Sequence, residues 1–283
     1  MKISLNHVNN HLRSPVDISE LSEKLFQLGH EHEIENEIFD FEFTPNRGDC
    51  LSLTGLLQDL KVFYELDPKF EIYNGEIDKF DFNFENKSPE SCSRISFLKI
   101  KVENDILEYK SYLKDYFEDF GIKKNNFFTD ISNYISYETG QPTHCYDANK
   151  ISSQLTFVDE DFSKPVEIET LLDTKIEING KNSVFKINDC IVNLAGVIGN
   201  KQTSCSSQTR EVIIECAYFN PESIMGKSVK YDVQSEAAHK FERGVDPSNH
   251  ENILRRFIYL VNEHASIKKL EIFSKNYKDI NKT

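Results

Sequence analysis

An apolar segment with one acidic residue inside it reads Val212-Ile213-Ile214-Glu215-Cys216-Ala217-Tyr218-Phe219-Asn220-Pro221. Its β-branched and aromatic residues predict a strand near 211–216. Glu215 interrupts this apolar strand, and a carboxylate in such a place has two interpretations. Either it faces solvent, because strand side chains alternate between two faces, or it is buried and needs a polar partner. The residues alone leave both interpretations open.

Further strands and helices are expected around this strand, in an irregular order. Strand-like segments lie near 154–159, 166–171 and 184–187, and helices are predicted near 106–120, after Asp130, up to Arg243-Gly244 and over about 248–264. Because the strands and helices do not alternate regularly, the pattern favours an α+β fold over a parallel, doubly wound sheet.

Residues 1–85 predict a small α+β domain of their own. A capping-box pattern at 17–20 begins one helix, and a second helix is expected over 53–64. Phenylalanines alternate with polar residues at 39–43 and again at 80–84, which predicts two half-buried strands. The second of these strands is expected to close the unit.

The remaining chain divides at a polar, proline-containing linker over 86–91. A larger mixed-sheet domain is expected over 92–262. The last segment, 263–283, is rich in lysine and is expected to be a solvated basic tail. Its polar end suggests a cut within a longer chain.

The composition is that of a soluble globular protein, with 39% hydrophobic and 28% charged residues. No apolar run of about 18 residues is present, so no membrane partner is expected. The six cysteines form no CxxC pair and no zinc-ligand spacing, so no metal is expected. Without a secretion signal, these thiols are most simply reduced and the protein cytoplasmic.

The net charge is −14, from 33 Lys and Arg against 47 Asp and Glu. Nucleic-acid binding draws much of its affinity from the neutralisation of phosphates by basic side chains. The chain is therefore not expected to hold an RNA tightly by itself, and nothing indicates DNA.

His144 is a candidate for chemistry because a helix is expected to end at Gly140, before Pro142. That ending leaves His144 on a loop, where functional side chains concentrate. The alternative is a structural histidine. The small residues of 193–200 likewise permit either the close approach of a ligand or merely a tight turn.

The segment 44–52 joins an expected strand to an expected helix. Asp49 or Ser52 fits the N-cap of that helix, and Gly48 fits a backbone position with positive φ. As bare chemistry the segment is structural.

Five motifs in order resemble successive signatures of the β subunit of bacterial phenylalanyl-tRNA synthetase, over about residues 1–262. They are Thr44-Pro45-Asn46-Arg47-Gly48-Asp49-Cys50-Leu51-Ser52, Asn133-Tyr134 with Gly140-Gln141-Pro142-Thr143-His144, Leu194-Ala195-Gly196-Val197-Ile198-Gly199, Glu215-x-Ala217-x-Phe219-x-Pro221, and Phe241-Glu242-Arg243-Gly244-Val245-Asp246-Pro247. The chain departs from the family at three positions. Asn200 replaces a usual glycine, and Ala238 and Lys240 stand where relatives usually have Ser and Arg.

The resemblance implies a small N-terminal α+β structural domain followed by a larger mixed-sheet editing domain. It also implies that an oligonucleotide-binding-like insertion is missing, because the strand near 38–43 leads directly into the 44–52 segment. In this family the editing domain hydrolyses tyrosine wrongly attached to phenylalanine tRNA. A pocket shaped for Phe cannot strongly exclude an analogue that adds a hydroxyl, whereas a second site that hydrogen-bonds the phenol can select it.

The resemblance also implies roles for individual residues. Glu215 would accept the phenol hydrogen bond, and Ala195-Gly196 would leave room for the aromatic ring. His144 and Asn133, with Ser132, would bind the terminal adenosine and the ester and position water. His144 is expected to be either a positioning group or a general base.

Two functions follow from this resemblance. In the first, the chain is part of phenylalanine–tRNA ligase and hydrolyses Tyr-tRNA(Phe), with the α subunit as partner in the complete enzyme. In the second, it is a scaffold or tRNA-docking module that no longer edits. Neither function needs a cofactor in this chain, because ATP and Mg serve only the complete synthetase. A third possibility is a protein that edits by itself.

Overall fold

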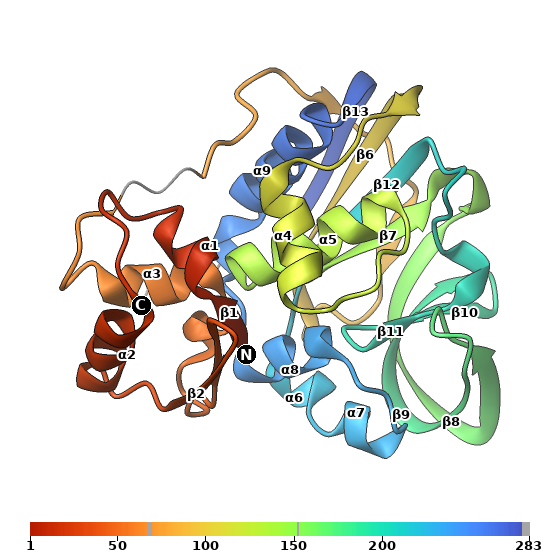
Figure 1. Ribbon diagram of the computed structural model, residues 1–283. Helices are drawn as coiled ribbons and strands as arrows, with labels where there is room; N and C mark the ends of the chain where they lie inside the picture. Colours follow the sequence, from red (N-terminus) through yellow and green to blue (C-terminus); the bar gives the residue numbers. More distant parts are fainter. Residues whose placement is uncertain (67–69, 152, 279–283) are drawn as a thin grey trace.

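Three β-sheets organise the computed structural model, which describes residues 1–66, 70–151 and 153–278. A three-stranded sheet belongs to a small N-terminal unit, and two five-stranded sheets form the larger body beside it (Figure 1). The mixture of helices and sheets confirms the α+β class.

The N-terminal unit pairs its strands in the order β1-β3-β2. Its elements are β1 (Lys2–Ser4), α1 (Leu5–Asn9), α2 (Ile18–Gln27), β2 (His32–Glu35), β3 (Ile38–Phe41), η1 (Gly48–Cys50) and α3 (Leu53–Leu60). The Asp17 side chain accepts hydrogen bonds from the backbone of Ser19 and Glu20, so the predicted helix start is confirmed. Ser52 caps α3.

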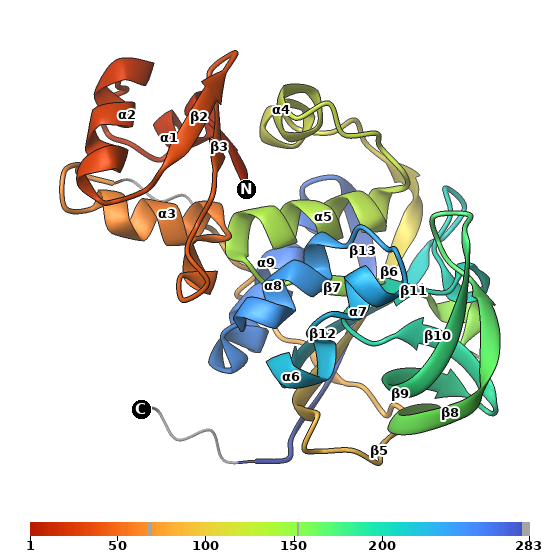
Figure 2. The same cartoon turned by 90° about the horizontal axis from the view of Figure 1, so that it is seen from below.

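The central sheet has the order β4-β13-β6-β12-β7. Its strands are β4 (Asp78–Lys79), β6 (Cys92–Ile106), β7 (Thr143–Asp147), β12 (Glu211–Phe219) and β13 (Ala265–Asn276). Helices α5 (Phe127–Thr139) and α9 (His250–Asn262) pack on one face, and α4 (Ser111–Asp119) packs on α5. The C-terminal end of α5 meets α3 of the N-terminal unit (Figure 2).

The outer sheet has the order β11-β10-β9-β8-β5 and covers the other face of the central sheet. Its strands are β5 (Phe84–Asn86), β8 (Leu155–Glu169), β9 (Lys175–Ile187), β10 (Cys190–Leu194) and β11 (Ile198–Gly199). Short helices complete the body: η2 (Ala148–Lys150), η3 (Lys201–Thr203), α6 (Pro221–Ile224), α7 (Lys227–Lys230), α8 (Glu236–Arg243) and η4 (Pro247–Asn249).

Strand β12 lies between two hydrophobic cores, which explains why it is apolar along its whole length. Val212 and Ile214 belong to the core under the helices, while Ile213 and Ala217 belong to the core between the two sheets. Strand alternation therefore directs Glu215 toward the outer sheet, and away from solvent. Of the two interpretations of this carboxylate, the buried one is correct.

Two strands correct the expected division of the chain. The predicted tail forms β13 over Ala265–Asn276, which pairs with β6 along its length; the lysines occupy the exposed positions of a strand. Residues 279–283 of that tail lie outside the described residues. The strand expected over 80–84 does not close the N-terminal unit, because β4 pairs with β13 and β5 with β8.

Two details of local structure also differ from expectation. His144 lies in strand β7 and not on a loop, because residues 143–147 pair with the edge of β12. Gly48 does not have a positive φ. It is needed for close approach, since a Cβ there would lie 2.9 Å from the Arg243 carbonyl oxygen. In the part of the chain that the structure describes, no helix has the length and apolar character to cross a bilayer.

Candidate functional site

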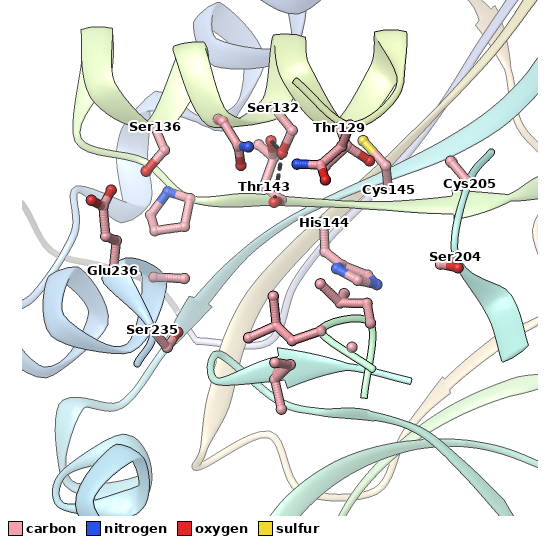
Figure 3. Close-up of a pocket in the computed structure, with 18 of the residues that line it drawn as sticks. Thr129, Ser132, Ser136, Thr143, His144, Cys145, Ser204, Cys205, Ser235 and Glu236 are labelled. Atoms are coloured by element: carbon pink, nitrogen blue, oxygen red, sulfur yellow. Dashed lines mark hydrogen bonds between the residues drawn. The ribbon is translucent and has the colours of Figure 1, made fainter. Parts of the chain in front are cut away.

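A cavity of about 650 Å³ opens between α5, β7, the β10–β11 connection and the start of α8. The volume suits a drug-sized ligand. His144 points into it beneath α5 (Figure 3). Hydroxyl and amide side chains form much of the lining: Asn125, Asn126, Thr129, Ser132, Asn133, Ser136, Thr143, Ser204, Ser206, Ser207, Gln234 and Ser235.

His144 is held in place by its strand and by two neighbouring residues. It pairs with Glu215 across β7 and β12, so both side chains lie on the cavity side of the sheet. Its ring meets Tyr146 edge-to-face, with centroids 4.4 Å apart. A Cβ on Gly199 would lie 2.3 Å from His144 Cε1, so the imidazole depends on a glycine at that position.

The imidazole of His144 is neutral and makes no hydrogen bond with the described residues. Its Nε2 is buried, and no described residue forms a hydrogen bond with it. Burial lowers the pKa of His144 to about 4, because the charged form would lose its hydration. A neutral ring with an unpartnered nitrogen can accept a hydrogen bond from water or from a ligand.

Glu215 is buried, with 4% of its surface exposed, and its partner is a phenol. The Tyr146 hydroxyl donates to Glu215 Oε2 at 2.6 Å and accepts from Asn193 Nδ2 at 3.0 Å. Burial raises the pKa of Glu215 to about 8, although the bond from Tyr146 acts in the opposite direction. A carboxyl group in this state is held near the boundary between its neutral and charged forms at physiological pH.

Helix α5 contributes Ser132 and Asn133 to the lining. The Ser132 hydroxyl lies 2.7 Å from Thr143 Oγ1 and 2.8 Å from the Thr143 carbonyl oxygen, so it ties the helix to the strand one residue before His144 (Figure 3). Asn133 makes no side-chain hydrogen bond with the described residues and keeps its amide available to the cavity.

Gly196 lines the cavity, whereas Ala195 lies behind its wall. Gly196 has a φ of 68°, and a Cβ there would lie 2.8 Å from Ile224 Cδ1 and 3.2 Å from Phe241 Cδ2. The position thus requires glycine both for its backbone and for space. Ala195 is fully buried, and its backbone N–H donates to the Ser183 carbonyl at 3.0 Å. Of the expected site residues, Ala195 alone is not brought to the cavity surface.

Three residues of the site escaped the reasoning from sequence. Tyr146 could have been found, because it stands two residues after His144 and shares its strand face. For Asn193, the sequence offers no signal of a role in the site beyond its position next to Leu194. Lys240 is buried on α8 and donates to the carbonyl and hydroxyl oxygens of Ser136, which fastens α8 to α5. Burial lowers the pKa of Lys240 to about 8.

The charge of the cavity is neutral to acidic. Among the described residues that line it, none is a lysine or an arginine, and Glu215 and Glu236 are acidic. Groups of this kind suit an uncharged polar ligand, such as a nucleoside or an ester, better than a phosphate.

One group of side chains in the N-terminal unit has metal-like spacing. Ligand atoms of His30, Cys50 and Asp59 lie within 4.8 Å of one another. His30 Nε2 lies 2.8 Å from Asp59, and Arg47 donates to the same carboxylate at 2.7 Å. Burial raises the pKa of the Cys50 thiol to about 12, so it is protonated. The guanidinium already supplies the positive charge that a metal would bring.

The fold and the cavity define an α+β domain with a ligand-sized pocket between two sheets. The chain belongs to the B3/4 domain family, whose model matches residues 91–266. This range contains every residue of the cavity described above.

Curated relatives are β subunits of phenylalanine–tRNA ligase. The protein of Francisella tularensis is 29% identical over 82% of this chain and 29% of its own length. That of Wolbachia sp. subsp. Brugia malayi is 30% identical over 81% of this chain and 31% of its own. The chain thus spans less than a third of these relatives. Among solved structures, an N-terminal fragment of the Pyrococcus horikoshii phenylalanyl-tRNA synthetase β subunit aligns with 99% of this chain and 79% of that fragment, at 10% identity and a TM-score of 0.45.

Proposed function

We propose that this chain hydrolyses the ester of tyrosine wrongly attached to phenylalanine tRNA. The observation that carries the proposal is one cavity in which the buried carboxyl group of Glu215 stands beside the neutral ring of His144. Among the described residues, Glu215 has only a phenol as hydrogen-bond partner and His144 has none. Membership of the B3/4 family, the family of the editing domain, supports it.

In this proposal the substrate side chain enters beside Gly196, and its phenol donates a hydrogen bond to Glu215. A phenylalanine side chain would leave the carboxyl group without that bond, which is how the cavity would favour tyrosine. Asn133 and the hydroxyl-rich rim would hold the ribose and the base.

The chemical step is attack of water on the ester carbonyl carbon. The bond between that carbon and the ribose oxygen breaks, the ribose oxygen gains a proton, and free tyrosine leaves. His144 accepts a hydrogen bond from the attacking water and orients it. Because its pKa lies near 4, it is a weaker base than an ordinary histidine, and positioning is its main contribution.

The whole-protein context is also a proposal. In a complete β subunit the α subunit would carry out ligation with ATP and Mg, and regions outside this chain would grip the tRNA. The net charge of −14 and the lack of basic side chains among the described lining residues support this dependence.

The test is deacylation of Tyr-tRNA(Phe) and Phe-tRNA(Phe) by this chain at high enzyme concentration, beside Glu215→Gln. The amide keeps the size of the side chain and can still accept from Tyr146. We expect faster release of tyrosine than of phenylalanine, with a preference that falls about tenfold or more in the variant.

The same assay separates the proposal from its alternative. If no release exceeds the uncatalysed rate, even with the α subunit supplied, the hydrolase proposal fails and the scaffold or docking module remains. If both esters are released at one rate, hydrolysis stands but the role of Glu215 in selection is wrong.

A further inference from the structure

Tyr146 lies behind the cavity wall, between the two sheets. Its side chain is fully buried, at 0% exposure, and it is not among the lining residues. A buried phenol of this kind usually has a hydrogen-bond partner. Here the partner is Glu215, a carboxyl group that lines the cavity, and not a backbone group of the core.

The hydrogen bonds form a directed chain from the outer sheet to the central sheet. Asn193 Nδ2 donates to the Tyr146 oxygen, and the Tyr146 hydroxyl donates to Glu215 Oε2. An oxygen that already accepts from an amide must turn its own proton elsewhere, so Asn193 directs the Tyr146 proton at Glu215. The described residues supply no partner for Glu215 Oε1, and Glu215 lines the cavity.

We propose that Tyr146 and Asn193 are positioning residues that orient Glu215 to recognise the phenol of a tyrosine side chain. The Tyr146 hydroxyl, directed by Asn193, donates to Oε2 of Glu215. Oε1 then stays available to accept a hydrogen bond from the phenol of the substrate. The inference rests on the proposed function, and it names the residues that set the tyrosine specificity of the site.

Two observations explain why the ring is suited to this task. The Tyr146 ring packs edge-to-face on His144, and its strand neighbour Cys145 faces the opposite core, so the ring has little freedom to turn.

A second phenol donating to the same carboxylate would favour its charged form, because each donor stabilises the anion. Binding of tyrosine would thus lower the pKa of Glu215, which would release its proton to water.

Two effects set the ionisation of Glu215: burial, the larger one, raises its pKa, and the hydrogen bond from Tyr146 lowers it. The titratable neighbours are Tyr146 and Cys145 on β7, Cys92 on β6, and Cys216 beside it in β12, each with a pKa raised by burial, while His144 faces it as a neutral ring. Asn193 on β10 and Phe241 on α8 carry no charge, and α8 also brings the acidic Glu236 to the cavity.

The experiment compares Tyr146→Phe with wild type and with Tyr231→Phe. Tyr231 is also a buried tyrosine whose hydroxyl donates to an amide oxygen, Asn182 Oδ1, at 2.9 Å, but it lies outside the cavity. The probes are amide analogues of tyrosyl-adenosine and phenylalanyl-adenosine, in which nitrogen replaces the ester oxygen. Calorimetry gives the affinity ratio of the two.

We expect wild type and Tyr231→Phe to prefer the tyrosyl analogue, and Tyr146→Phe to lose about tenfold of that preference. A carbon-13 titration of the Glu215 carboxyl group, assigned with Glu215→Gln, is expected to move to higher pH in Tyr146→Phe. If Tyr146→Phe does not fold, Asn193→Ala is used in its place, because it removes the hydrogen bond that directs the Tyr146 hydroxyl. We expect this variant to lower the preference for the tyrosyl analogue and to move the Glu215 titration to higher pH.

The outcomes separate this inference from the function on which it rests. If wild type prefers the tyrosyl analogue and Tyr146→Phe keeps both the preference and the carboxyl titration, the positioning role is wrong while the editing proposal stands. If wild type binds neither analogue or shows no preference, the tyrosine-reading function fails, and this inference with it.

Discussion

Two buried glutamates on opposite faces of the central sheet, Glu138 and Glu215, have different kinds of partner. On the helix side, Glu138 on α5 is fully buried, and Arg256 on α9 donates to both of its oxygens at 2.7 Å. On the cavity side, Glu215 is buried, and the described residues give it no cation and one phenol, which donates to one of its oxygens.

One histidine on each face, His264 and His144, repeats this contrast. His264, on the helix side, uses both ring nitrogens: Nδ1 donates to the Leu260 carbonyl at 2.7 Å, and Nε2 accepts from the Lys110 backbone at 3.0 Å. His144, on the cavity side, uses neither with the described residues. A buried polar group with all its bonds made serves the fold, whereas one left incomplete beside a cavity is available to a ligand.

The largest expected effect separates the two histidines by activity. We expect His144→Ala to lower hydrolysis of Tyr-tRNA(Phe) by about 10²-fold or more, because the group that orients the water is lost. Its melting temperature should stay near that of wild type, since no hydrogen bond to the described residues is broken. Single-turnover deacylation and thermal melting measure the two effects.

The matched control is His264→Ala. It removes two hydrogen bonds and leaves the Lys110 N–H without its acceptor, so it should lower the melting temperature. The folded fraction should still hydrolyse the ester. Equal unfolding of both variants would contradict the contrast, because His144 would then be structural too.

The second expected effect separates the two glutamates by stability. Glu138→Gln leaves the buried guanidinium of Arg256 without its countercharge, at a cost of roughly 3–5 kcal/mol. Glu215→Gln breaks no ion pair and should change the free energy of unfolding by about 1 kcal/mol or less at pH 7. Denaturant unfolding of both variants, followed by circular dichroism, measures the difference. A cost for Glu215→Gln that equals that of Glu138→Gln would contradict it.

The contrast between the two faces was only partly predictable from the sequence. The apolar run around Glu215 predicted β12, and the motif order pointed to Glu215, His144 and Gly196, because each stands in a recognisable local pattern. That Glu215 is buried follows only from the second sheet, which covers the face where alternation would otherwise have met solvent.

The parts that could not be predicted depend on long-range pairing. Tyr146 and Glu215 are 69 residues apart, and only the antiparallel register of β7 and β12 brings them together. The lysine-rich end looked like a tail because charge patterns do not distinguish a solvated strand face from a free segment; β13 exists because β6 offers it an edge. The family resemblance led us to expect Ala195 in the lining with Gly196, yet its N–H is used within the outer sheet.

The smallest expected effect is the pH dependence of stability that two groups of the cavity face, Glu215 and His144, produce. Burial raises the pKa of Glu215 to about 8, above the value near 4.5 of an unfolded chain. The folded protein therefore holds a proton that the unfolded chain releases between these values, and Glu215 lowers stability as pH rises from 4.5 to 8. His144, with its pKa lowered to about 4 from 6.5, acts oppositely, so its contribution rises between pH 4 and 6.5.

Glu215→Gln should remove the contribution to stability that falls as pH rises, and it should keep the contribution of His144, which rises with pH. Relative to wild type, we expect its melting temperature to gain a few degrees, about 2–4 °C, between pH 6.5 and 8, where only the carboxyl group of Glu215 is changing its charge among these two. Scanning calorimetry of both proteins at matched ionic strength measures the gain. Parallel curves for the two proteins would mean that Glu215 is already ionised when buried, and the cavity side would then hold a charged carboxylate, as the helix side does with its arginine pair.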